Sequence, residues 1–157
     1  MSTKPDHWFK VPLVVMPVII QDGKVLLGLR KNTGFMDGHY ALPGGKHDGN
    51  EPLKQAVARE VKEEVGIACH PDGIEFKSLI HLNIDNMDKD KEILRELVYF
   101  VFKINKFEGE IINAEPDKCE KIEFFPLNQL PANITDLSRL CIEHAVKDIT
   151  YSELGWE

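Results

Sequence analysis

The chain has 157 residues, of which 43% are hydrophobic and 29% are charged, and its formal net charge is −7. These values are typical of one globular domain with its own hydrophobic core, and we expect a single domain over residues 1–157. The negative charge argues against binding of a nucleic-acid polymer, but not against a small polyphosphate, because a bound metal ion reverses the local sign of charge.

The first elements predicted are two strands and a loop. The stretch Val11–Ile20 is apolar and rich in Val and Ile, which predicts a buried strand. The sequence of Gln21–Lys24 is typical of a hairpin turn, so a second strand is expected over Val25–Arg30. Two glycines indicate a loop over Asn32–His39, followed by a short extended piece at Tyr40–Pro43.

One helix is predicted over Pro52–Val65, which contains no internal glycine or proline and has helical periodicity. Pro52 suits the first helical turn, with Asn50 or Glu51 as the cap, and Gly66 suits the position just past the end. At about 100° per residue, two neighbouring stripes run along this helix. The apolar stripe, expected to face the core, contains Val57, Ala58, Val61 and Val65. The other stripe contains Ala56, Glu60, Glu63 and Glu64.

The second half of the chain alternates strands with connecting segments. The predicted elements are strands over Phe76–Ile84 and Glu96–Ile104 with a charged loop, Asp85–Arg95, between them, a turn at Lys106–Glu110, a short strand at Ile122–Phe125, a connector at Pro126–Pro131, a second helix over Asp136–Lys147 and a tail ending near Trp156. Strands interspersed with two helices predict a mixed sheet covered by helices, in an α+β or α/β fold.

The cysteines and the N-terminus bear on the cellular compartment. Cys69, Cys119 and Cys141 are far apart and form no CxxC pair, so we expect free thiols rather than a disulfide framework or a zinc site. No signal peptide is visible, and the longest apolar run is too short for a membrane helix. The sequence therefore predicts a soluble cytoplasmic protein without a membrane partner.

The most informative feature is the crowding of Glu60, Glu63 and Glu64 within two turns of the predicted helix. Like charges at these spacings destabilise a helix by a few tenths of a kcal/mol per pair. A divalent cation would convert this repulsion into binding, and Mg²⁺ is the usual ion for oxygen ligands that share their metal with phosphates. The alternative is a plain solvated face. Gly44 and Gly45 allow close backbone approach, so that a carbonyl could become a further ligand.

The stretch from residue 45 to residue 67 resembles the signature of the Nudix hydrolases. The signature is Gly, five residues, Glu, seven residues, Arg-Glu, an aliphatic residue, any residue, Glu-Glu, any residue, Gly and an aliphatic residue. Its nine specified positions are filled by Gly45, Glu51, Arg59, Glu60, Val61, Glu63, Glu64, Gly66 and Ile67. The preceding Leu42–Gly45 and the late segment Phe124–Pro131 also resemble the family, so the resemblance covers about residues 11–147.

The resemblance implies an α/β fold, an α/β/α sandwich with a central mixed sheet and a loop–helix–loop catalytic motif. It also implies hydrolysis of a nucleoside diphosphate linked to another group, by metal-assisted attack of water on phosphorus with Mg²⁺ or Mn²⁺. Glu60 and Glu64 are the implied metal ligands, assisted by Glu63 and the Gly44 carbonyl. Arg59 and Glu51 are implied to pair and orient them. Glu63 or Glu64 is the candidate general base.

Further site residues are expected outside this motif. Arg30 ends the second strand where the family often has a phosphate-binding basic residue, although a solvated arginine is an equal alternative. Glu115 or Glu120 is a candidate additional metal-site acid. Asn133 resembles a base-contacting residue of MutT-like members, with a plain turn asparagine as the alternative.

The substrate is inferred from absent markers. Members that act on ADP-ribose tend to carry a proline about sixteen residues past the motif, and the corresponding segment here, His81–Asp85, has none. The markers of dinucleoside polyphosphate and coenzyme A hydrolases are also absent. This favours the MutT-like group, which converts nucleoside triphosphates, including oxidised or non-standard forms, to monophosphate and pyrophosphate. The alternatives are hydrolysis of a nucleotide sugar or similar compound, and a non-catalytic nucleotide-binding protein. The expected partner is a small nucleotide, bound by a monomer or a homodimer.

Overall fold

The computed structural model describes residues 8–84 and 96–156. The strands are β1 (Leu13–Gln21), β2 (Lys24–Arg30), β3 (Tyr40–Ala41), β4 (Gly45–Lys46), β5 (Ile74–Asn83), β6 (Glu96–Ile104), β7 (Cys119–Pro126) and β8 (Tyr151–Leu154). The helices are α1 (Leu53–Val65) and α2 (Asp136–Lys147), with a short 3₁₀ turn at Pro71–Gly73. The loop predicted over Asp85–Arg95 lies outside the described residues.

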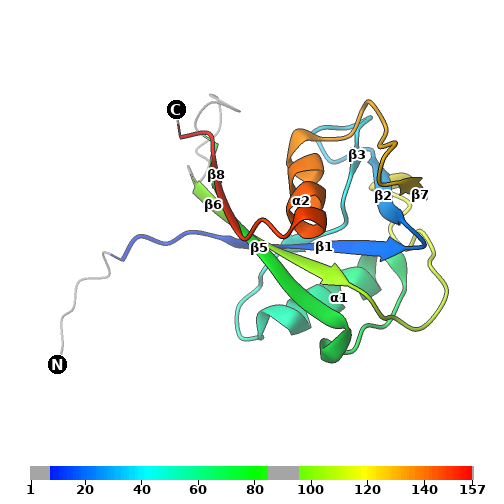
Figure 1. Cartoon of the computed structure of the whole chain (residues 1–157), viewed down its shortest axis with the longest axis horizontal. Helices are drawn as coiled ribbons and strands as arrows, with labels where there is room; N and C mark the ends of the chain where they lie inside the picture. The colour runs from blue at the N-terminus through cyan, green and yellow to red at the C-terminus, as the bar shows by residue number, and fades with distance from the viewer. Residues whose placement is uncertain (1–7, 85–95, 157) are drawn as a thin grey trace.

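These strands form one mixed sheet. Its main path runs β3-β2-β1-β6-β5-β8, while β4 pairs with β1 and β7 pairs with β2. Two pairings are parallel, β1 with β6 and β5 with β8, and the others are antiparallel. The helices α1 and α2 lie on opposite sides of β1 (Figure 1). The α/β/α sandwich with a central mixed sheet is therefore confirmed.

The alternation of side chains along β1 produces two separate cores. Val14, Met16 and Val18 belong to the core that is covered by α2. Val15 and Ile19 belong to the other core, which contains the buried face of α1. Because β1 is apolar on both faces, it reads as a continuous hydrophobic run and holds both helices against the sheet.

The helix predicted over the glutamate-rich motif is present, but its start differs from the prediction. Pro52 occupies the N-cap position without a side-chain hydrogen bond, and α1 begins at Leu53. The expected cap by Asn50 or Glu51 is wrong, because the Glu51 carboxylate bonds to Arg59 instead. The end is as predicted: Gly66 has φ +75°, and its N–H donates to the Lys62 carbonyl.

Two short strands and several boundaries were not predicted. Strand β4 pairs with β1 at residues where the sequence predicted no strand, and β8 pairs in parallel with β5, where the sequence predicted a tail. Strand β5 begins at Ile74 rather than Phe76, and β7 begins at Cys119 rather than Ile122. Strands of two to four residues are too short to show an alternation of apolar and polar residues. They form because a neighbouring strand supplies their hydrogen bonds.

The cysteines are free, as predicted. Cys141 is buried in the core beneath α2, and this burial raises the pKa of its thiol to about 12. Burial raises the pKa of Cys69 to about 11. Both thiols are therefore protonated at neutral pH. No helix in the described part of the chain is long and apolar enough to cross a membrane.

Candidate active site

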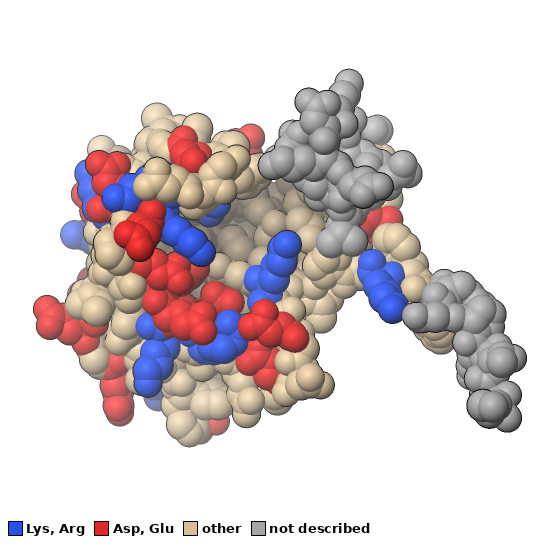
Figure 2. Space-filling view, turned by 180° about the vertical axis from the view of Figure 1, so that it is seen from behind, with Lys and Arg blue, Asp and Glu red and all other residues tan. Residues whose placement is uncertain are grey.

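A cleft of about 540 Å³ lies between α1, the strands β2 and β7 and the loop that precedes β7. Glu60, Glu63, Glu64 and Glu115 line this cleft, together with two basic residues, Arg30 and Lys118. On the face drawn in Figure 2, acidic side chains gather beside a hollow, and Lys and Arg side chains lie among them. The cleft therefore combines a carboxylate-rich wall with positive charge.

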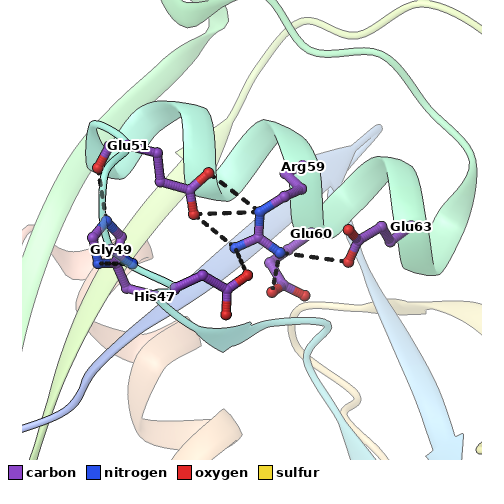
Figure 3. Close-up of polar contacts among 7 residues, drawn as sticks. His47, Gly49, Glu51, Arg59, Glu60 and Glu63 are labelled. Carbon is purple, nitrogen blue, oxygen red and sulfur yellow. Dashed lines mark hydrogen bonds and ion pairs between the residues drawn. The ribbon is translucent and has the colours of Figure 1, made fainter.

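Arg59 connects the acidic residues of the motif (Figure 3). Its Nη2 lies 2.8 Å from Glu51 Oε1, and its Nη1 lies 2.9 Å from Glu60 Oε1. The same Nη1 lies 3.5 Å from Glu63 Oε2, and Nη2 lies 3.3 Å from Asp48 Oδ2. The hydrogen bonds to Glu51 are the largest cause of a raised pKa at Arg59, so the guanidinium remains charged and fixes the carboxylates around it.

The loop before α1 is held by His47, which the signature leaves unspecified. The Nδ1 of His47 accepts a hydrogen bond from the Gly49 N–H at 3.2 Å, so its Nε2 carries the proton and donates to the Glu51 carbonyl at 2.7 Å (Figure 3). The Glu51 carboxylate in turn holds Arg59, whose hydrogen bond lowers the pKa of Glu51. His47 thus anchors the segment that orients Arg59.

Glu60 lies against the backbone of Gly45. It is only 8% exposed, and a Cβ atom placed on Gly45 would lie 2.5 Å from Glu60 Oε1. Burial raises the pKa of Glu60, while the hydrogen bond from Arg59 opposes this shift. A side chain at position 45 would occupy the space of the Glu60 carboxylate, which would then have to move.

Glu64 is half-buried, and its Oε2 accepts a hydrogen bond from the Gly44 N–H at 2.8 Å. Burial raises the pKa of Glu64 to about 8 against this bond, and the nearby Glu60, Glu115 and Glu63 raise it further. A carboxyl group in this environment becomes ionised more readily when a cation lies beside it. The Gly44 carbonyl, the other predicted ligand, belongs to the same residue, which lies in the connection between β3 and β4.

The residues of this wall fit a hard divalent cation. Their donors are carboxylate oxygens, which Mg²⁺ and Mn²⁺ prefer, and beside the burial that raises the pKa of Glu64 the neighbouring carboxylates raise it further. Among residues 8–84 and 96–156, no three His, Cys, Asp or Glu side chains already surround one point that would hold a metal ion. The wall therefore supplies suitable ligands, and some of them have to rearrange when a cation binds.

The pKa of Glu64 leads to a prediction about stability without metal. Its folded pKa of about 8 exceeds its ordinary value of 4.5, so its contribution to stability is complete below pH 4.5 and is lost as the pH rises to about 8. At about 1.4 kcal/mol per pKa unit the full shift corresponds to about 5 kcal/mol, and solvent screening of this half-buried carboxyl lowers that figure. We therefore expect metal-free protein to lose roughly 1–3 kcal/mol more stability than Glu64→Gln over this range. Urea unfolding at several pH values measures this difference, and identical pH dependence of the two proteins would contradict the assignment.

The structure brings some of the residues predicted outside the motif to the cleft. Glu115 lines it, whereas Glu120, the alternative acid, does not. Arg30 also lines it, with its Nε donating to the Phe35 carbonyl at 2.8 Å. Asn133 does not line the cleft, and its amide donates to the Gly38 carbonyl at 3.0 Å, which is the behaviour of a turn asparagine.

Two residues of the site had no signal in the sequence. His47 occupies an unspecified position inside the motif, and its hydrogen bonds depend on the loop conformation. Lys118 lies in a charged segment that resembles any solvated loop. A basic residue close to the predicted acid Glu115 was the one available hint, since the same loop carries both of them to the cleft.

The sequence of this chain is similar to those of known proteins. The sequence pattern of the NUDIX domain family matches residues 10–144. An ADP-ribose pyrophosphatase of Methanocaldococcus jannaschii is 36% identical over 121 residues, which cover 76% of this chain and 65% of that protein. An oxidized purine nucleoside triphosphate hydrolase of Danio rerio is 28% identical over 130 residues, covering 78% of this chain and 71% of that protein.

Solved structures agree with these matches. A MutT NUDIX hydrolase from Burkholderia pseudomallei superimposes with a TM-score of 0.73 and 31% sequence identity, over 87% of this chain and 98% of that chain. The matched residues 10–144 include α1, the cleft-lining carboxylates and the buried residues of both cores except Ala145. On its sequence and its fold together, the chain belongs to the Nudix hydrolase family.

Proposed function

We propose that this protein is a metal-dependent hydrolase of phosphoanhydride bonds in nucleoside diphosphate-linked compounds, with a nucleoside triphosphate as its preferred substrate. The products would be a nucleoside monophosphate and pyrophosphate. The observation that carries the proposal is the presence of Glu60, Glu63, Glu64 and Glu115 on one cleft, with Arg59 fixing the first two. The proposed partner is a small nucleotide bound in the cytoplasm by a monomer or a homodimer.

The proposed metal ligands are Glu60 and Glu64, with Glu63, Glu115 and the Gly44 carbonyl completing the set. When bound, Mg²⁺ or Mn²⁺ supplies neutralisation of phosphate charge and a more acidic water molecule. The chain itself orients the ligands: Arg59 holds Glu60 at 2.9 Å, and the Gly44 N–H holds Glu64 at 2.8 Å. Glu63 or Glu64 accepts the proton from the attacking water.

Two substrate classes have support. The similarity to the Danio rerio oxidized purine nucleoside triphosphate hydrolase supports a triphosphate, as do the absent sequence markers of other classes. The second candidate is a nucleotide sugar such as ADP-ribose, which the name of the 36% identical archaeal relative favours although the expected proline is missing. A non-catalytic binding protein is disfavoured, because every carboxylate of the signature is present.

A panel of nucleotides with Mg²⁺ tests the proposal. The panel contains the common nucleoside triphosphates, their 8-oxo purine forms and ADP-ribose, and the products are resolved chromatographically. We expect monophosphate and pyrophosphate from at least one triphosphate, at a higher kcat/KM than for ADP-ribose. Higher kcat/KM for ADP-ribose, with release of AMP, would replace the triphosphate by the second candidate. Binding without any turnover would contradict both.

A further inference from the structure

The segment from Asn113 to Cys119, called here the 113–119 loop, is closed by its own hydrogen bonds. The side-chain amide of Asn113 donates to the Cys119 carbonyl at 2.8 Å. The N–H groups of Lys118 and Cys119 both donate to the Glu115 carbonyl at 3.0 Å. These bonds bring the two ends of the loop together and fix the backbone of its two cleft-lining charged residues, Glu115 and Lys118.

The same loop is also attached to both walls of the cleft. On one side, the Ala114 N–H donates to the carbonyl of Glu64, at 3.1 Å. On the other side, the Lys31 N–H donates to the Lys118 carbonyl at 3.0 Å, and the Asn32 amide donates to the Asp117 carbonyl at 3.2 Å. The loop therefore joins the end of α1 to the end of β2, beside Arg30, and is prepared before any ligand arrives.

The two cations that line the cleft are not neutralised by a carboxylate in contact. Arg30 donates to neutral acceptors, the Phe35 carbonyl at 2.8 Å and Thr33 Oγ1 at 3.1 Å. Lys118 forms no ion pair with any residue that the structure describes, although Glu115 lies three positions before it. A cleft that must hold a metal-bound polyphosphate needs cations of this kind, because one divalent ion leaves much of a triphosphate's charge unbalanced.

We propose that Lys118, which lines the same cleft as the carboxylates, together with Arg30 binds the phosphate oxygens that the metal does not hold. This inference rests on the proposed function, and it assigns Lys118 a part in the preference for triphosphates. A diphosphate-linked sugar carries less charge than a triphosphate, so the loss of one cation weakens its binding less. The 113–119 loop is then a substrate-binding element as well as the carrier of Glu115.

Lys118→Met is a clean test, because the loop is held by the main chain of Lys118 and not by its side chain. Lys121→Met is the matched control. It removes the same charge a few residues along, from a lysine that pairs with Glu123 at 4.0 Å and does not line the cleft. Its neighbour Ile122 lines the cleft, so Lys121 points to the other face of β7.

The first measurement is calorimetric binding of inorganic tripolyphosphate with Mg²⁺, which requires neither the correct base nor turnover. We expect Lys118→Met to bind about 5- to 20-fold more weakly than the wild type, with a change of less than about twofold for Lys121→Met. Lys118→Arg should recover most of the affinity. Equal weakening by Lys118→Met and Lys121→Met, or no binding by the wild type, would overturn the proposal.

The second measurement separates this inference from the proposed function. With the best substrate of the nucleotide panel, Lys118→Met should raise KM by the same factor and change kcat less than about threefold. An effect on ADP-ribose as large as that on a triphosphate would overturn the role in preference. If no nucleotide is hydrolysed but tripolyphosphate binding still depends on Lys118, the proposed function fails and the binding role stands. If hydrolysis occurs and Lys118→Met behaves as the wild type, the binding role alone fails.

Discussion

Glu64→Gln should lower turnover about 100-fold or more while leaving the fold intact. Glutamine has almost the shape of glutamate, and its amide oxygen can still accept the Gly44 N–H that Glu64 accepts at 2.8 Å. What is lost is the negative charge that a divalent cation requires from this position. The fold should survive, because burial disfavours the ionised form of Glu64 and raises its pKa to about 8, whereas glutamine has no ionised form.

Three measurements check this prediction: kcat at saturating Mg²⁺, metal affinity by titration, and thermal unfolding of metal-free protein. Glu143→Gln is the matched control, since Glu143 is a glutamate on α2 that pairs with Lys147 at 3.1 Å and lies outside the cleft. The control should retain wild-type turnover. Near-normal kcat in Glu64→Gln would contradict the assignment of Glu64 as a metal ligand or base.

Gly45→Ala should reduce both metal affinity and turnover by about 10- to 100-fold. The added Cβ would lie 2.5 Å from Glu60 Oε1 and 2.6 Å from Glu60 Cδ, which is closer than atoms can approach. To avoid this contact, Glu60 has to give up its buried position and its hydrogen bond from Arg59. The carboxylate must therefore leave its position, and overpacking of this kind also destabilises the fold by about 1–3 kcal/mol.

Gly23→Ala provides the control for Gly45→Ala. Gly23 lies in the β1–β2 turn with φ +73° and nothing within 4 Å of an added Cβ, so alanine there introduces backbone strain without a clash. We expect a loss of stability of about 1 kcal/mol with unchanged kcat. If Gly45→Ala has the same metal affinity and the same kcat as Gly23→Ala, Glu60 does not need its observed position.

The sequence predicted long elements and local chemistry well. Helix α1 follows from the spacing of its apolar residues, and Gly66 correctly marks its end. The pairing of Arg59 with Glu51, implied by the resemblance, is present at 2.8 Å. These features depend on residues close in the chain: α1 and its end follow from helical geometry, and Glu51 lies in the loop directly before the helix that carries Arg59.

The tertiary structure decided the features that bring together segments distant in the sequence. Strand β4 pairs with the part of β1 that β2 leaves unpaired, and β8 pairs with the side of β5 that faces away from β6. Of the two acids predicted near the last strand, the closed 113–119 loop brings Glu115 and not Glu120 to the cleft. The same loop brings Lys118 to the cleft. Asn133, in contrast, donates its amide to the Gly38 carbonyl and does not line the cleft.

By itself, the sequence determined the family and the carboxylates of α1, because the signature is one continuous stretch and Glu60, Glu63 and Glu64 lie on one helix. Only the tertiary structure decided which remote side chains join them. The reason is physical: a loop's contribution depends on hydrogen bonds to elements far away in the chain, such as the Ala114 N–H to Glu64 and the Lys31 N–H to Lys118. The periodicity and spacing of residues in the sequence do not predict those bonds.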